Sequence, residues 1–127
     1  MLSVIRRILL LLAVLPLVSA AQPASIDALA ATADNFKLLL ENEQVRVLEY
    51  ARQPGARDQW HTHPPKVSYV VTGGTLRITT EDGKSFLAED AAGPATWRGA
   101  VGRHFVENVG KTPVRVVLVE VKSAAQE

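Results

Sequence analysis

The chain has 127 residues, which suits one domain and is too short for two. It carries 14 Lys and Arg against 13 Asp and Glu, and 47% of its residues are hydrophobic. This balance excludes a disordered polyelectrolyte, gives no indication of a nucleic-acid partner and provides enough apolar residues for a packed core. The absence of cysteine excludes disulfides, thiolate metal sites and thiol nucleophiles.

Residues 1–21 have the pattern of a secretory signal peptide. Arg6 and Arg7 form a basic start, and an apolar run follows over residues 8–18. This run is shorter than the roughly 20 residues that a membrane-spanning helix needs, and the small residues 19–21 fit a cleavage site. We therefore predict a periplasmic or secreted protein that keeps no stable membrane anchor. The alternative is a run that stays uncleaved and anchors the chain.

Residues 22–35 are rich in alanine, and they predict an N-terminal arm or a short helix. From residue 36 to 122 the pattern is that of β-strands, followed by a tail over residues 123–127. The expected strands cover residues 36–40, 45–50, 67–72, 75–80, 85–87, 103–108 and 114–121.

Glycine-containing pairs indicate the turns between these strands. Gly73-Gly74 predicts a tight hairpin that joins residues 67–72 to residues 75–80, and Asp82-Gly83 predicts a second two-residue turn. Many short strands with frequent glycine and proline between them are typical of an all-β domain of antiparallel strands, either a sandwich or a barrel.

The three histidines carry most of the functional information. His61 and His63 are two residues apart, so on a strand both imidazoles lie on one face, about 6.6 Å apart along the chain, and can converge on one metal ion. His104 lies in another expected strand and could close over the same site. Imidazole suits Fe, Mn, Ni, Cu or Zn. The alternative is a pair of exposed strand histidines and an unrelated third.

The spacing of these histidines resembles the cupin superfamily, whose first motif reads G(X)5HXH(X)3–4E(X)6G and whose second ends in H(X)3N. The matching residues are Gly55, His61, His63 and Gly74 for the first motif, and His104 and Asn108 for the second. The resemblance covers residues 36–122 and implies a small jelly-roll β-barrel, usually a homodimer. It also implies that all three histidines are ligands of one divalent transition metal.

The chain departs from the cupin motifs at two places. The family's glutamate ligand falls on Val67 or Ser68, and the P-x-G before the second motif's histidine falls on Gly99 and Val101. The resemblance therefore implies a three-histidine site with open coordination positions. Without the carboxylate a bound ion is more positive, which favours a small anionic ligand. The alternative is that the histidines are an evolutionary remnant and no longer bind a metal.

Alternation from His63 predicts that Val67, Tyr69 and Val71 face the barrel interior. Tyr69 is therefore the candidate catalytic acid or base, and the alternative is a core tyrosine with a satisfied hydroxyl. If residue 67 faces inward in this way, Val67→Glu would restore a fourth ligand.

Charged residues inside the expected strands are further candidates. Glu49 and Glu120 are the only acidic residues that could stand in for the missing glutamate. Arg46, Arg77 and Arg115 are strand residues, and any one that pointed inward would bind a carboxylate. The alternative for each arginine is a solvated face.

The leading hypothesis is an exported cupin-domain protein with a three-histidine metal site that acts on a small anionic substrate. As an enzyme it would be dioxygenase-like or isomerase-like, with metal-assisted chemistry. The fold by itself does not name the reaction. The alternative is a non-catalytic small-molecule- or metal-binding protein, or an accessory protein of a catabolic pathway. A third reading is a structural dimer without a ligand.

Overall fold

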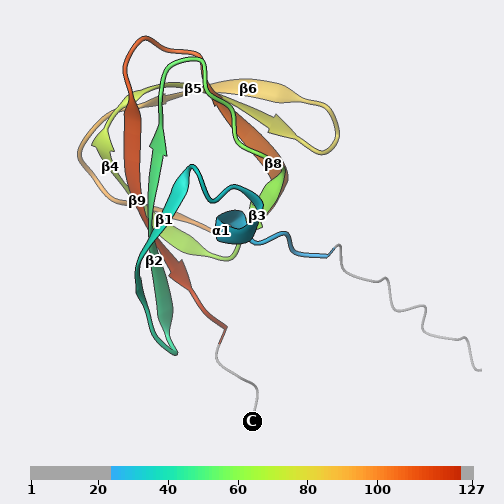
Figure 1. Ribbon diagram of the computed structural model, residues 1–127, viewed down its shortest axis with the longest axis vertical. Coiled ribbons are helices and arrows are strands. Elements are labelled where there is room, and N and C mark those ends of the chain that lie inside the picture. Colours follow the sequence, from blue (N-terminus) through green and yellow to red (C-terminus); the bar gives the residue numbers. More distant parts are fainter. Residues whose placement is uncertain (1–23, 124–127) are drawn as a thin grey trace, which may run out of the picture.

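The computed structural model describes residues 24–123, which form nine β-strands and one short helix (Figure 1). In chain order these are α1 (Ala28–Ala31), β1 (Phe36–Glu41), β2 (Val45–Arg52), β3 (His61–His63), β4 (Lys66–Thr72), β5 (Gly74–Thr80), β6 (Ser85–Asp90), β7 (Thr96–Arg98), β8 (Val101–Asn108) and β9 (Val114–Val121). The predicted signal peptide and most of the predicted C-terminal tail lie outside the described residues. No helix within residues 24–123 is long and apolar enough to cross a membrane.

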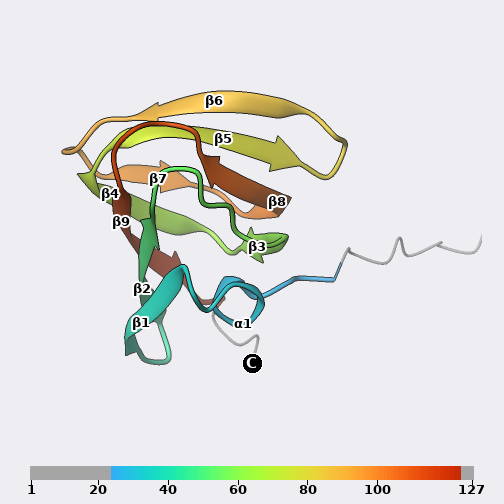
Figure 2. The ribbon, with the colours of Figure 1, turned by 45° about the horizontal axis from the view of Figure 1, so that its top comes forward.

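The strands form two antiparallel sheets that face each other (Figure 2). The larger sheet has five strands in the order β1-β2-β9-β4-β7, and the smaller sheet has four in the order β3-β8-β5-β6. Leu48, Val116 and Leu118 from the larger sheet pack with Leu76 and Val106 from the smaller one. The prediction of an all-β jelly roll of antiparallel strands is confirmed.

The turn at Asp82-Gly83 is confirmed, since it joins β5 to β6 and Gly83 has a φ of 80°. The hairpin predicted at Gly73-Gly74 is wrong, because β4 and β5 belong to different sheets. Here the chain crosses from one sheet to the other and touches the end of β6: a Cβ on Gly73 would lie 2.0 Å from the Asp90 carbonyl oxygen. The glycine is required by this close approach of two backbones.

The N-terminal arm is fastened to the strand that carries two of the histidines. Asp27 caps the single turn of α1 by accepting a hydrogen bond from the Ala30 amide at 3.0 Å. Ile26 accepts from the Thr62 amide at 2.8 Å and donates its own amide to the Thr62 hydroxyl at 2.9 Å. Thr62 thus faces the arm, while the histidines on either side of it face the barrel.

Candidate metal centre

The three histidines lie together at one end of the barrel. His61 and His63 are on β3, and His104 is on β8, directly opposite His61 in the antiparallel ladder. All three side chains are buried, and each offers one ligand atom within 4.8 Å of the other two. The structure thus brings together the three histidines that the sequence analysis considered as candidate ligands.

A hydrogen bond fixes the Nδ1 atom of each histidine ring. The acceptors are the Gln59 carbonyl for His61 at 2.7 Å, the Gly102 carbonyl for His104 at 2.8 Å and the Glu120 carboxylate for His63 at 2.7 Å. These oxygens can only accept, so each Nδ1 carries the proton and each Nε2 keeps its lone pair. Metal-bound histidines have the same arrangement, in which the second ring nitrogen donates to a carbonyl or a carboxylate.

Burial keeps the rings in the neutral form that binds metal. It lowers the pKa of His63 to about 4, and it also lowers the pKa values of His61 and His104. At neutral pH three neutral imidazoles therefore face one another. This donor set fits a divalent transition metal such as Fe, Mn, Ni, Cu or Zn, with the remaining coordination positions open to a ligand.

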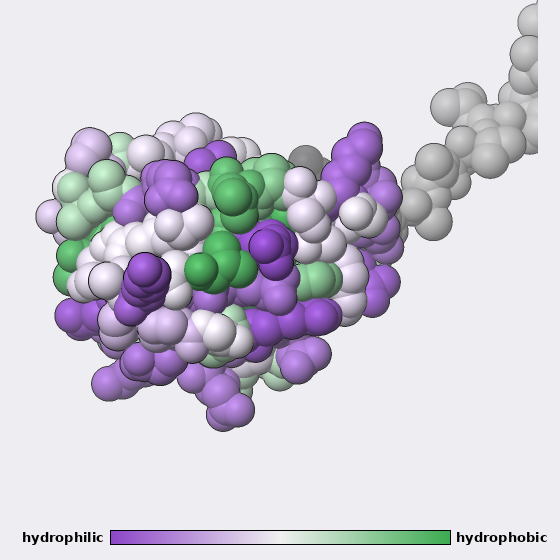
Figure 3. Space-filling model, turned by 90° about the horizontal axis from the view of Figure 1, so that it is seen from above, coloured by the Kyte–Doolittle hydropathy of each residue, from purple (hydrophilic) through white to green (hydrophobic). Residues whose placement is uncertain are grey.

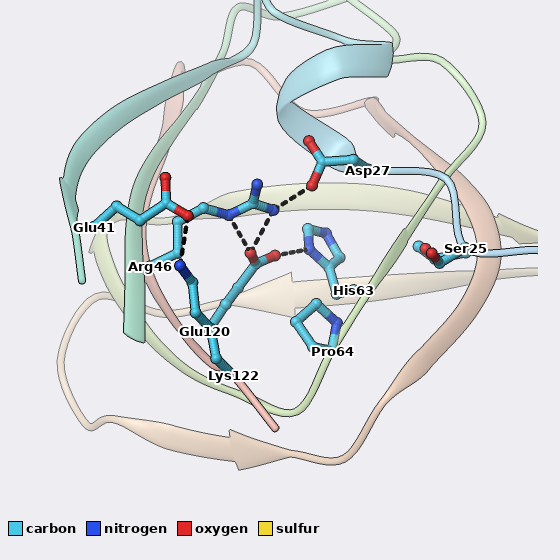
Figure 4. Close-up of a pocket in the computed structure, with 9 residues that line it drawn as sticks. Ser25, Asp27, Glu41, Arg46, His63, Pro64, Glu120 and Lys122 are labelled. Atoms are coloured by element: carbon cyan, nitrogen blue, oxygen red, sulfur yellow. Dashed lines mark hydrogen bonds and ion pairs between the residues drawn. The ribbon is translucent and has the colours of Figure 1, made fainter. Parts of the chain in front are cut away.

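Glu120 holds His63 in place and is itself held by Arg46 (Figure 4). The Arg46 guanidinium donates to one Glu120 oxygen from Nε at 2.8 Å and from Nη2 at 2.7 Å, while His63 uses the other oxygen. Arg46 also pairs with Asp27 at 2.5 Å. Burial opposes ionisation of Glu120, but the hydrogen bonds from His63 and Arg46 outweigh it and lower the pKa of the carboxyl.

Glu120 is thus the partner of a candidate ligand and does not replace the family's glutamate as a ligand. The sequence alone does not indicate this role, although Glu120 stands out in it as a glutamate inside an expected strand. Glu49, the other candidate, is not part of the site, since it pairs with Arg115 at 2.5 Å on the outer side of the larger sheet. Arg77 is also exposed, 4.0 Å from Glu107.

The histidines open into a cavity of about 260 Å³ between the two sheets. Its apolar walls come from both sheets and include Leu76, Ile78, Val116 and Leu118. Its polar lining comprises the three histidines together with Tyr50, Lys66, Ser68, Thr80, Asp90, Thr96 and Arg98. The cavity therefore combines apolar walls with polar groups that could orient a ligand, which is typical of a small-molecule site.

The interior position predicted for Tyr69 is wrong. Lys66, Ser68 and Val70 line the cavity, whereas Tyr69 lies on the opposite face of β4 and is 48% exposed. The Pro64-Pro65 segment separates β3 from β4, so alternation does not continue from one strand to the next, and a shift of one residue reverses every side chain. The tyrosine that does line the cavity is Tyr50, whose buried hydroxyl has no hydrogen-bond partner among the described residues.

Comparison with solved structures identifies the architecture. A cupin domain from Bordetella pertussis Tohama I is 26% identical, with 83% of this chain and 100% of that chain covered and a TM-score of 0.64. An RmlC-like cupin family protein with a double-stranded β-helix fold from Methanocaldococcus jannaschii is 14% identical, with 68% and 77% covered and a TM-score of 0.55. A protein with a double-stranded β-helix domain from Klebsiella pneumoniae is 22% identical, with 70% and 72% covered and a TM-score of 0.54.

No protein-family model matches the sequence, and no curated protein is significantly similar to it. The structural neighbours nevertheless agree with one another: they are cupin or double-stranded β-helix proteins. The chain therefore has the cupin fold, and its neighbours support the cupin superfamily that the histidine motifs indicated.

Proposed function

We propose that this chain is a metal-dependent cupin protein that binds one divalent transition metal through His61, His63 and His104. The metal would act on a small anionic molecule in the barrel cavity. The observation that carries the proposal is the hydrogen bond at each Nδ1 atom, because it leaves the Nε2 atom of every ring in the cluster free to bind an ion. Such preorganisation is what a metal centre requires.

The proposed activity is dioxygenase-like or isomerase-like. A bound ion would supply a Lewis acid that polarises a carbonyl or carboxylate oxygen, or a redox centre where the ion is iron. The chain itself would exclude water with the apolar walls of the cavity and orient the ligand with its polar lining residues. Tyr50 replaces Tyr69 as the candidate acid or base, since it lines the cavity and its hydroxyl has no hydrogen-bond partner among the described residues.

Elemental analysis and metal titration test this proposal. The wild-type protein, purified without chelator or His-tag, should contain close to one transition-metal ion per chain. His61→Ala and His104→Ala should lose the metal and still unfold cooperatively, and Tyr69→Phe, a change on the outer face, should keep it. Metal that persists in the histidine variants, or a wild-type protein that takes up none, would overturn the proposal. Metal binding without turnover of small carboxylic acids would favour the non-catalytic binding protein.

We further propose that the protein is exported and forms a homodimer. Export rests on the signal-peptide pattern of residues 1–21. For the dimer, Val47, Val119, Val67 and Trp97 lie in one row across the outer face of the larger sheet, and Trp97 is 61% exposed. On the face seen in Figure 3, by contrast, hydrophobic side chains occur in small groups among hydrophilic ones.

Two measurements test these proposals. The protein should be recovered from the periplasmic fraction with its N-terminus near residue 22, and light scattering should give twice the mass of one chain. Trp97→Ser should shift the protein toward the monomer. A full-length product in the cytoplasm would refute export, and a wild-type monomer would refute the dimer.

A further inference from the structure

A row of charged residues crosses the inward face of the larger sheet next to the histidines. Arg46 of β2, Glu120 of β9, Lys66 of β4 and Arg98 of β7 are direct cross-strand neighbours in that order. The row thus contains three cations and one carboxylate. Behind it along the strands lies a second row, in which Leu118, Ser68 and Thr96 are neighbours.

The one carboxylate of the row is already occupied. Glu120 accepts from His63 with one oxygen and from Arg46 with the other, and Arg46 has Asp27 as a second partner. Within residues 24–123 the structure has no ion pair for Lys66 or Arg98. These two cations are directly opposite each other on neighbouring strands. Like charges in this position destabilise a sheet.

Lys66 is also almost completely buried. It is 6% exposed, and it lines the cavity together with Arg98, which lies at the exposed edge strand. A buried cation without an ion-pair partner is costly. The acidic residue in the cavity lining is Asp90, and it forms no ion pair with either cation in the described part of the chain. The cavity therefore presents two positive groups that a negative ligand would neutralise.

We propose that Lys66 and Arg98 bind the carboxylate of a short, otherwise apolar carboxylic acid. An arginine fork matches a planar carboxylate, and the lysine adds a point charge beside it. The neighbouring Ser68 and Thr96 supply hydroxyls, and the apolar walls formed by Leu118 and Val116 accommodate the hydrocarbon part. The further suggestion that the bound acid reaches the histidines rests on the proposed metal function; the carboxylate site itself does not.

Calorimetric titration of the metal-free, chelator-treated protein tests the site, with hexanoate, hexanamide and inorganic phosphate as probes. Hexanoate should bind, and the neutral hexanamide should bind at least about tenfold more weakly, because it lacks the charge-assisted hydrogen bonds. Lys66→Met and Arg98→Gln should each weaken hexanoate binding by about tenfold or more. Lys84→Met and Arg77→Gln, which remove the same charges from exposed positions, should leave it unchanged.

Equal affinity for hexanoate and hexanamide would overturn the proposal, and so would tighter binding of phosphate or unchanged binding in both cavity variants. Lys66→Arg should rescue the binding that Lys66→Met loses. If a change at the buried Lys66 impairs folding, the Arg98→Gln variant decides the outcome, because Arg98 lies on the exposed edge strand. Two controls separate this site from the metal proposal. Lys66→Met should still take up metal, and His104→Ala should lose metal but bind hexanoate in the metal-free state.

Discussion

His63 and Glu120 are 57 residues apart in the sequence, and they meet through a hydrogen bond of 2.7 Å in which the imidazole Nδ1 donates to the carboxylate. Both side chains are buried, and Arg46 holds the other carboxylate oxygen. The pair resembles a carboxylate–histidine–metal arrangement, in which the carboxylate fixes the ring's tautomer and makes it a better ligand. The acidic residue of this site therefore acts behind a histidine and is not a direct ligand.

Replacement of this carboxylate should weaken metal binding without unfolding the protein. Glu120→Gln keeps an oxygen for the His63 Nδ1 proton but loses the negative charge, so we expect a loss in metal affinity of about tenfold, at the low end for a second-layer change. The measurement is a competition titration against a chromophoric chelator. Glu49→Gln is the matched control, because Glu49 pairs with Arg115 away from the histidines, and it should leave the affinity unchanged. An unchanged affinity in Glu120→Gln would mean that the carboxylate does not tune the site.

The stability of the metal-free protein should fall as the pH is lowered from about 6.5 to about 4. Burial lowers the pKa of His63 from 6.5 to about 4, so between these values the unfolded chain binds a proton that the folded chain refuses. The contribution is present above pH 6.5 and is lost as the pH falls through the folded-state pKa. It amounts to up to about 3 kcal/mol, at about 1.4 kcal/mol for each pKa unit. Urea unfolding at several pH values measures it, and His63→Gln should show a shallower pH dependence.

The β-strands and the grouping of the histidines on strands could be predicted from the sequence, because both depend on local patterns. Strand β9 coincides with the Val-rich run of residues 114–121, and the spacing of His61 and His63 holds because they lie on one uninterrupted strand. The contact between His63 and Glu120 could not be predicted in this way. It depends on how β3 and β9, from different sheets, face each other across the barrel.

The prediction of which residues of β4 face inward was wrong for a different reason. Its alternation was counted from His63 through Pro64 and Pro65, but two prolines end one strand before the next begins, and the count restarts at Lys66. This count therefore placed Tyr69 inside the barrel and Lys66 outside it, whereas Lys66 lines the cavity. No residue type identifies this phase, since Val67 and Val70 suit either face of the strand.

This phase makes a prediction about the position of the missing glutamate. Val67→Glu should leave metal affinity unchanged, because position 67 pairs with Trp97 and Val119 in the outward-facing row and does not line the cavity. This is the opposite of what continuous alternation from His63 predicts. Metal titration of the variant decides between the two phases: tighter binding would place residue 67 inside the barrel and contradict the register of β4. Val119→Glu, its neighbour in the same outer row, is the control for an added surface carboxylate.

Removal of the buried lysine charge should stabilise the metal-free protein. Burial lowers the pKa of Lys66 from 10.5 to about 8, and the nearby Glu120 only partly opposes this. Below pH 8 the folded protein therefore carries the full cost of a buried ammonium, and Lys66→Met should raise the free energy of unfolding by up to about 3 kcal/mol at pH 7, at about 1.4 kcal/mol per pKa unit. The wild-type lysine becomes neutral in the folded state above pH 8, so the advantage of the variant should shrink as the pH rises toward 10.5. Urea unfolding at pH 7 and pH 10 measures both effects, with the exposed Lys84→Met as the control that should change neither. A Lys66→Met variant less stable than the wild type at pH 7 would show that the lysine has a compensating partner in the barrel. A more stable variant would mean that the wild-type chain keeps a destabilising cation in the cavity, as a site for an anionic ligand requires.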